Sequence, residues 1–282
     1  MRFAGSFYPS DKEELEEEVK EMLSLKKENV KMGIVPHAGW MFSGRLAGDV
    51  IGRILEKKNF IIFGVNHSGI GGKISFSMKD FQTPLGIVKN NQALTNKIIK
   101  KLDGEFQKSS DFRLVSNRRL IPEINEEAHE NEHSIEVQLP FLQQSQKKFE
   151  IVPILLKNLD YEDCKKIAKA ISEIIDDVVF VLISSDFTHY GKSYGFTPFK
   201  DKVRKNLYYL DNEIIINILN KNSKKVFELG EKSTVCGVYG LTIATEISKI
   251  KEYKGKLVEY YTSGDVVDNW DNVVGYGGIG FS

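Results

Sequence analysis

Apolar and polar residues follow two different spacings along this chain. Four short runs are apolar throughout or nearly so, which is typical of strands buried inside a parallel sheet: 33–36, 60–65, 149–155 and 178–183. Apolar residues recur at helical spacing in six longer segments, which predicts helices over 11–23, 43–55, 93–102, 134–144, 160–176 and 236–247. Two more helices are expected within 199–230, and two more strands over 256–262 and 273–280.

The segments between these elements carry weaker signals. Residues 74–78 and 86–88 are expected to pair as a hairpin, and the polar stretch 104–131 is expected to be the longest loop. Pro140 should kink or shorten the fourth helix, because proline lacks the N–H that a helix interior needs. Strands that alternate with helices predict a three-layer α/β fold, with a largely parallel or mixed sheet flanked by helices, in a single domain over 1–282.

Composition narrows the class of protein. The 282 residues are 41% hydrophobic, which is enough for a core that needs no disulfides. The 39 basic and 39 acidic residues give a net charge of +0, so nucleic acid is not an expected partner. Two cysteines exclude a disulfide framework, and no apolar run reaches the roughly 18 residues of a membrane span. The N-terminal residues lack the apolar stretch of a signal peptide, so we expect a cytoplasmic protein with no membrane partner.

Chemically versatile side chains follow three of the predicted strands where each strand ends. His37 follows the first strand and His67 follows the second. Asp186 and His189 follow the strand over 178–183. The carboxyl ends of parallel strands meet at one edge of a sheet, so these side chains are expected to share a pocket. Each histidine alone is more typical of a loop or core position, but the repetition favours a common site.

Cys236 stands at the start of the helix predicted over 236–247. A helix N-terminus favours the thiolate form of cysteine through the helix dipole. Imidazole and thiolate together suit zinc, copper or iron, so Cys236 is a candidate metal ligand beside the histidines. The alternative is a buried cysteine without reactivity.

Two short motifs match well-known patterns but lack the structural setting that each requires. His129 and His133 bracket an HExxH sequence, which binds zinc in metalloproteases when both histidines lie on one helix. Here the sequence falls in the predicted loop, so a protease is not expected, although His133 can still line the pocket. Residues 275–280 spell GxGxxG, but no helix follows to hold a pyrophosphate, so a dinucleotide site is not expected.

Six sequence blocks stand out in order along the chain: AGSFYP (4–9), PHAGW (36–40), GVNH (64–67), EHSIEVQLP (132–140), SSDFTHYG (184–191) and VCG (235–237). Together they resemble the Memo family over essentially the whole chain. The resemblance implies a fold similar to that of class III extradiol dioxygenases, non-haem iron enzymes that open catechol rings. It also implies a pocket in which two histidines and a cysteine replace the two histidines and glutamate of those enzymes.

Carried onto this sequence, the resemblance implies that His37, His67 and Cys236 hold the metal, with iron or copper favoured over zinc. Next to the metal, His189 would act as an acid or base and Asp186 would orient a histidine. The remaining residues of these blocks expected to line the ligand pocket are His133, Phe7, Tyr8 and Trp40.

Three functions fit this pocket. The first is a metal-dependent redox enzyme or oxygenase. The second is a non-catalytic module that binds a phosphorylated or other anionic peptide, or a small molecule, through histidines and backbone N–H groups. The third is a metal-assisted hydrolase, with Asp186 or Glu132 as general base. Prokaryotic members of the family are associated with radical-SAM proteins, which implies a partner of that kind.

Overall fold

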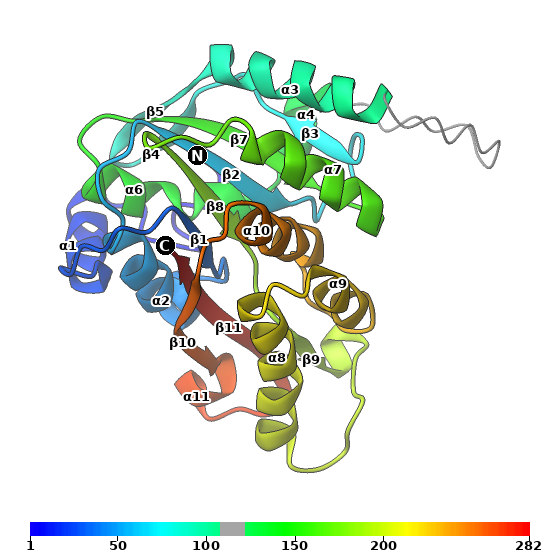
Figure 1. Ribbon diagram of the computed structural model, residues 1–282. Helices are drawn as coiled ribbons and strands as arrows, with labels where there is room; N and C mark the ends of the chain where they lie inside the picture. The colour runs from blue at the N-terminus through cyan, green and yellow to red at the C-terminus, as the bar shows by residue number, and fades with distance from the viewer. Residues whose placement is uncertain (108–121) are drawn as a thin grey trace.

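A mixed sheet of eleven strands runs through the part of the chain that the structure describes, residues 1–107 and 122–282 of a computed structural model (Figure 1). Its main path, from edge to edge, is β10 (Gly255–Thr262), β11 (Asn272–Phe281), β1 (Met32–Val35), β8 (Val179–Ser184), β2 (Asn59–Val65), β7 (Glu150–Leu156), β3 (Ile74–Phe76) and β6 (Glu123–Ile124). Three short strands lie off this path: β4 (Phe81–Thr83), β5 (Gly86–Asn90) and β9 (His189–Gly191).

The four central strands of the sheet are parallel, and the strands on either side of them pair antiparallel with this centre. β1, β8, β2 and β7 lie side by side in parallel, whereas β11 pairs antiparallel with β1 and β3 pairs antiparallel with β7. Residues on both faces of these central strands are buried, as their continuous apolar runs predicted. The predicted mixed, largely parallel α/β fold is therefore confirmed.

Helices cover both faces of the sheet and form two separate apolar cores. One face packs against α3 (Gln92–Gln107), α7 (Tyr161–Ser172), α8 (Val203–Leu219), α9 (Ser223–Glu231) and α10 (Val238–Ile250). The opposite face packs against α1 (Lys12–Met22), α2 (Trp40–Gly52), α4 (Glu126–Glu130), α5 (His133–Glu136) and α6 (Leu139–Ser145). Figure 1 shows the two helical layers with the sheet between them, which is the three-layer arrangement. No helix in the described ranges combines the length and apolar character that crossing a bilayer requires.

The predicted hairpin between 74–78 and 86–88 is wrong in its pairing. Strand β5 pairs with β4, and the turn at Pro84 lies between those two strands. Strand β3 instead joins β7, with Ser75 opposite Leu155. All three residues of β3 are buried, so this strand gains more by adding to the central sheet than by forming an isolated hairpin.

The predicted loop over 104–131 is shorter than expected. Helix α3 continues to Gln107, because Glu105 keeps the helical spacing of buried residues and accepts a hydrogen bond from Lys169 at 2.8 Å. The segment also contains β6 and α4. The part of the prediction that falls on 108–121 lies outside the described residues.

The helix predicted over 134–144 is divided into α5 and α6, as its proline indicated. Pro140 occupies the first turn of α6, where its missing N–H is not needed. Further elements had no signal in the sequence pattern, among them α11 (Ser263–Val267) and the strand β9 that carries His189.

The GxGxxG sequence lies within β11 and has a packing role. A side chain on Gly277 would place its Cβ 2.4 Å from the ring of Phe187, and one on Gly275 would lie 2.2 Å from the carboxylate of Asp211. These glycines therefore allow β11 to approach the segment that leads to the functional site. A strand setting agrees with the expectation that the motif is not a dinucleotide loop.

Candidate metal centre

Three neighbouring parallel strands deliver the candidate residues to one edge of the sheet. His37, His67 and Asp186 each stand two residues beyond the end of their strand: β1, β2 and β8, respectively. Since β8 lies between β1 and β2, the three side chains enter the same crevice. The fold thus brings together segments that are about 150 residues apart, as the hydrogen bond from the backbone N–H of His37 to Asp186 Oδ1 (2.7 Å) shows.

Three imidazoles form the centre of this crevice. In the described part of the chain, His37, His67 and His133 offer ligand nitrogens that all lie within 4.8 Å of one another. Their ring centroids are 5.4 Å apart for His37 and His67, 5.3 Å for His37 and His133, and 4.9 Å for His67 and His133. Cys236 joins the group from the other side, with Sγ 3.2 Å from Nε2 of His37. Such a set of nitrogen and sulfur donors could hold a transition metal.

Hydrogen bonds fix which nitrogen of His37 faces the crevice. Nδ1 lies 3.1 Å from the hydroxyl oxygen of Ser184, which itself donates to the carbonyl of Ser134 at 2.6 Å. That hydroxyl also accepts from Nε2 of Gln138, so it acts as an acceptor toward the imidazole. Nδ1 of His37 therefore carries the proton, and the lone pair of Nε2 points to Cys236 and the centre of the cluster.

Glu132 orients His67 in the same way. The carboxylate accepts from the backbone N–H of His67 at 2.8 Å and from Nδ1 of its ring at 3.0 Å. The backbone N–H of Ser134 donates to the same carboxylate at 2.9 Å. With Nδ1 committed to Glu132, Nε2 of His67 remains for a metal, which is the carboxylate–histidine arrangement common around metal sites.

His189 also donates a hydrogen bond through Nδ1, as His37 and His67 do, but it lies outside the three-histidine group. Its Nδ1 is 3.1 Å from both the carbonyl of Phe187 and the carbonyl of Thr234, so Nδ1 is the donor and Nε2 is free. The ring packs edge-on against Tyr194, with centroids 5.1 Å apart. A free Nε2 lets this residue accept or donate a proton at the margin of the crevice.

Asp186 and Cys236 contact each other through the backbone. The N–H of Asp186 donates to Sγ of Cys236 at 3.3 Å, and the thiol lies 3.5 Å from the carbonyl of Asp186. The Asp186 carboxylate accepts a hydrogen bond from the backbone N–H of His37 at 2.7 Å. The expectation that Asp186 orients a histidine stays a prediction. Cys236 lies two residues ahead of α10, close to the predicted helix start.

The aromatic residues of the N-terminal block divide into two groups. Phe7 lies against the cluster of histidines, with its ring centroid 4.4 Å from that of His133. Tyr8 and Trp40 are buried instead in the core, where Trp40 stacks on Phe141 at 4.1 Å. The hydroxyl of Tyr8 donates to Glu136 at 2.8 Å, and the indole N–H of Trp40 donates to a backbone carbonyl. Both polar groups are therefore satisfied inside the protein.

Burial keeps the imidazoles of His37 and His133 neutral. Burial, followed by the neighbouring charge of His67, lowers the pKa of His37 to about 3. Burial and the charge of His37 lower the pKa of His133 to about 4. Neutral imidazole is the form that binds metal. Burial raises the pKa of the Asp186 carboxyl and, together with that carboxyl, the pKa of the Cys236 thiol.

One side of the cluster is open to solvent. His37 is 2% exposed, whereas the side chains of His67 and His133 are 37% and 20% exposed. A ligand can therefore approach from the side of His67 and His133, while the buried His37 forms the floor.

The HExxH sequence contributes to this centre by a different geometry from that of metalloproteases. His129 lies on α4 and His133 begins α5, so one continuous helix does not carry both. His129 is buried away from the cluster, with Nε2 3.0 Å from the carbonyl of Ser75. The turn between the helices instead delivers Glu132 and His133 to the crevice, and the orienting role of Glu132 had no separate signal in the sequence.

Comparison with known proteins places this geometry in a family context. A protein-family model described as "Memo-like protein" matches residues 1–280. The chain is 36% identical to a MEMO1 family protein of Archaeoglobus fulgidus, covering 99% of this chain and 98% of that protein. It is 35% identical to one of Thermococcus onnurineus (99% and 97% covered) and 32% identical to one of Aquifex aeolicus (99% and 97%).

A solved structure of an uncharacterized protein from Escherichia coli K12 shares the fold. It aligns with a TM-score of 0.53 at 9% sequence identity, and the alignment covers 89% of this chain and 99% of that one. This likeness concerns the arrangement of the elements alone.

Proposed function

The chain belongs to the Memo-like protein family, and from this premise we propose that it is a metal-dependent redox protein. The ion, iron or copper, would be held by His37, His67 and Cys236 at the carboxyl edge of the sheet. The observation that carries the proposal is the convergence of three imidazoles, whose ligand nitrogens lie within 4.8 Å of one another. The Cys236 Sγ lies next to them, 3.2 Å from Nε2 of His37.

The donor set supports an ion that changes oxidation state. Imidazole suits iron, copper and zinc, and a thiolate adds the soft, electron-rich donor that copper and iron sites use. Bound iron or copper would supply one-electron or oxygen chemistry at the open side of the crevice. His189 would exchange a proton through Nε2, while Phe7 and His133 would form the wall against which a small molecule or peptide ligand packs.

Metal content after reconstitution tests the proposal. Apo-protein prepared with chelator and then loaded anaerobically with Fe(II) or Cu(II) should bind about one ion per chain. The His37→Ala, His67→Ala double variant should lose that ion, and His129→Gln should keep it because His129 lies outside the cluster. A wild-type protein without stoichiometric metal, or a double variant that binds as well as wild type, would overturn the proposal.

The third ligand can be assigned separately. A thiolate ligand gives Co(II)-substituted protein a sulfur-to-metal absorption band, which Cys236→Ser should abolish. If the band is absent in wild type and the His133→Ala variant loses the metal, the third ligand is the imidazole of His133, which lies within the same group of nitrogens.

The exposed edges of His67 and His133 favour one alternative, a binding module for an anionic ligand. Such a module would bind a phosphotyrosine peptide equally well with and without chelator. The redox proposal expects binding near the centre to depend on the metal. The predicted association with a radical-SAM protein is likewise a proposal, and co-purification from a native source would test it.

A further inference from the structure

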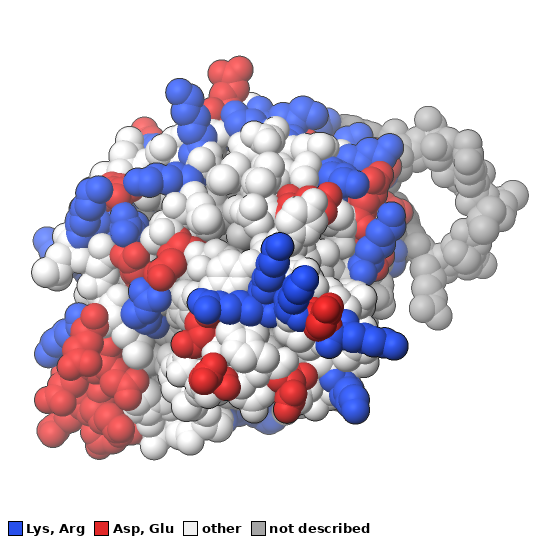
Figure 2. Space-filling model, turned by 90° about the horizontal axis from the view of Figure 1, so that it is seen from below, with Lys and Arg blue, Asp and Glu red and all other residues white. Residues whose placement is uncertain are grey.

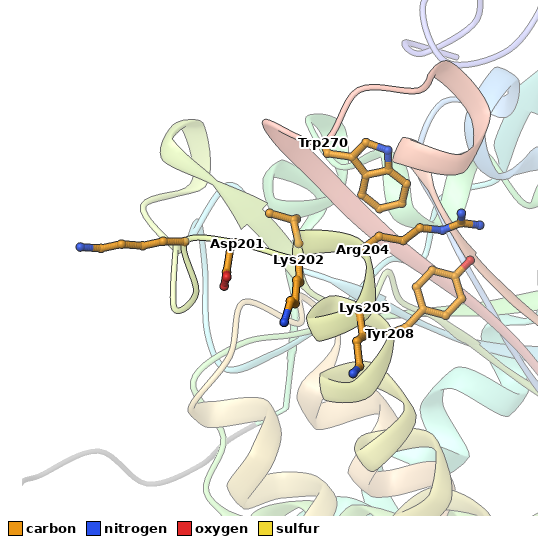
Figure 3. A pocket seen from close by; sticks show the side chains of 8 residues that line it. Asp201, Lys202, Arg204, Lys205, Tyr208 and Trp270 are labelled. Carbon is orange, nitrogen blue, oxygen red and sulfur yellow. The ribbon is translucent and has the colours of Figure 1, made fainter.

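A second cavity, of about 720 Å³, lies at the start of α8 and shares no residue with the metal centre. It is drawn in Figure 3, and Figure 2 views the molecule from the end at which α8 begins. Its volume falls within the range of small-molecule sites and exceeds what a single phosphate would fill. The cavity is open to solvent, and its walls combine basic side chains with two aromatic rings.

Three of its cations have no acidic partner within the described ranges. Lys200, Lys202 and Lys205 line the cavity, are exposed, and form no ion pair there, whereas many other basic residues of this chain do. Asp201 is the acidic residue among the lining side chains, so the four basic residues and one acid leave an excess of positive charge. This local excess of positive charge contrasts with the net charge of +0 for the whole chain.

The start of α8 adds to the positive potential around these cations. The first turn of α8 contains no acidic residue, and no side chain caps it. The N–H groups of a first helical turn lack intrahelical partners and create a positive potential, which lysines at that end reinforce. An anion in the cavity would neutralise the lysines and accept hydrogen bonds from those N–H groups.

The aromatic wall is built before any ligand arrives. Arg204 passes between Trp270 and Tyr208 in Figure 3, with its guanidinium 5.6 Å and 5.9 Å from the two ring centroids. Asp265 fixes this arrangement, because it pairs with Arg204 at 2.9 Å and accepts from the Tyr208 hydroxyl at 2.7 Å. Beneath the cavity, Trp270 packs on the small core of Leu207 and its neighbours.

We infer that this cavity binds a nucleoside polyphosphate. The phosphates would contact Lys200, Lys202, Lys205 and the N–H groups of the first turn of α8. The nucleoside would lie along the apolar wall that includes Trp270. Two or more phosphate charges match the three unpaired lysines, and the size of the cavity leaves room for the planar group.

Titration calorimetry and fluorescence test this inference in a buffer with chelator, which keeps the metal centre empty. ATP should bind with saturation, and pyrophosphate should bind about tenfold more weakly or worse, since it lacks the planar group. ATP should also quench tryptophan emission. The chain has two tryptophans and Trp40 is buried, so Trp270→Phe should abolish the quenching but leave calorimetric binding.

Paired lysine variants locate the site. The triple change of Lys200, Lys202 and Lys205 to Gln should weaken ATP binding by more than about tenfold. A control triple of the same charge change on exposed lysines elsewhere, Lys147, Lys148 and Lys224 to Gln, should stay within about twofold of wild type. All six lysines are exposed, so both proteins should fold, which circular dichroism verifies.

Four results would overturn the inference. The first two are no saturation by ATP up to about 1 mM, and an equal loss of ATP affinity in both triple variants. The other two are equal affinity for pyrophosphate and ATP, and tighter binding of an RNA oligonucleotide or an anionic lipid vesicle than of ATP. Because the His37→Ala, His67→Ala variant should bind ATP normally, failure of the metal proposal and failure of this one are distinguishable.

Discussion

The carboxylate of Glu132 offers the sharpest test of how the proposed metal centre is organised. It is 2% exposed and accepts hydrogen bonds from the backbone N–H and ring of His67 and from the backbone N–H of Ser134. In Glu132→Gln, one of its oxygens becomes an NH₂ group, which faces donors and can accept nothing. At least one buried donor is then left without a partner, and the ring of His67 loses its orientation.

Two independent arguments give a similar magnitude for this change. Burial alone would raise the pKa of Glu132, but the hydrogen bond and charge of His67, with the Ser134 N–H, bring it down to about 2. A fall from the usual 4.5 to about 2 corresponds to about 3.4 kcal/mol of stability at neutral pH. Loss of charge-assisted hydrogen bonds in a buried site costs about 1.5–3 kcal/mol for each. We therefore expect Glu132→Gln to lower the free energy of unfolding by about 3 kcal/mol.

The sign of the pH dependence adds a second check. A carboxyl whose pKa is lowered by folding contributes stability above pH 4.5 that is lost as the pH falls toward 2. The difference in unfolding free energy between wild type and Glu132→Gln should therefore narrow from about 3.4 kcal/mol at pH 7 to about 2.6 kcal/mol at pH 4. Urea unfolding of the apo-proteins at both pH values measures this difference. The exposed Glu127→Gln is the control, expected within about 0.5 kcal/mol of wild type.

Metal titration of the same variant completes the test. Residues that orient a metal ligand typically raise affinity by about 10–100-fold, and Glu132→Gln should lose affinity in that range. A loss of stability below about 1 kcal/mol, or a gap between the variants that does not change with pH, would refute the assigned role of Glu132. Unchanged metal affinity would instead refute the placement of His67 in the metal site.

Three further predictions address the supporting structure. Burial raises the pKa of Asp211 to about 6, so the contribution of this carboxyl to stability is present below pH 3.8 and lost as the pH rises through 6. Wild type should therefore lose about 2.4 kcal/mol of stability relative to Asp211→Asn between pH 4 and 7, and parallel pH profiles of the two proteins would contradict this. Gly277→Ala should destabilise by about 1–3 kcal/mol because its Cβ meets the ring of Phe187, whereas Gly104→Ala meets open space and should stabilise by about 0.5–1 kcal/mol in thermal unfolding. Metal at a hundredfold excess over Kd should add about 2.7 kcal/mol to wild type, an increment that the His37→Ala variant should lack in the same scan.

The central strands were predictable because burial on both faces leaves a continuous apolar run. Segment 178–183 shows this most clearly, since all six residues of β8 are buried. The pairing of β3 with β7 was not predictable in the same way, because strand partners are chosen by contacts between segments about 80 residues apart. A sequence pattern therefore indicates that a segment forms a strand, but it gives less information on which strand that segment pairs with.

Part of the candidate site was predictable for a related reason. His37, His67 and Asp186 follow apolar runs that read as parallel strands, and the topology of such sheets brings their ends together. The hydroxyl of Ser184 and the carboxylate of Glu132 fix the imidazole tautomers, yet neither position differs locally from an ordinary polar residue. Orienting partners of this kind are defined by geometry across the fold, and a linear pattern does not contain that geometry.

The HExxH sequence shows how a motif can mislead about mechanism and still mark a site. Its two histidines would lie one turn apart on a continuous helix, but the chain leaves α4 at Glu130 and starts α5 only at His133. That interruption sends His129 into the core and turns Glu132 and His133 toward His67. The residues that a metalloprotease would use as ligand and base are thus separated. The same sequence provides instead a carboxylate that orients His67 and a third imidazole beside those of His37 and His67, which follow β1 and β2.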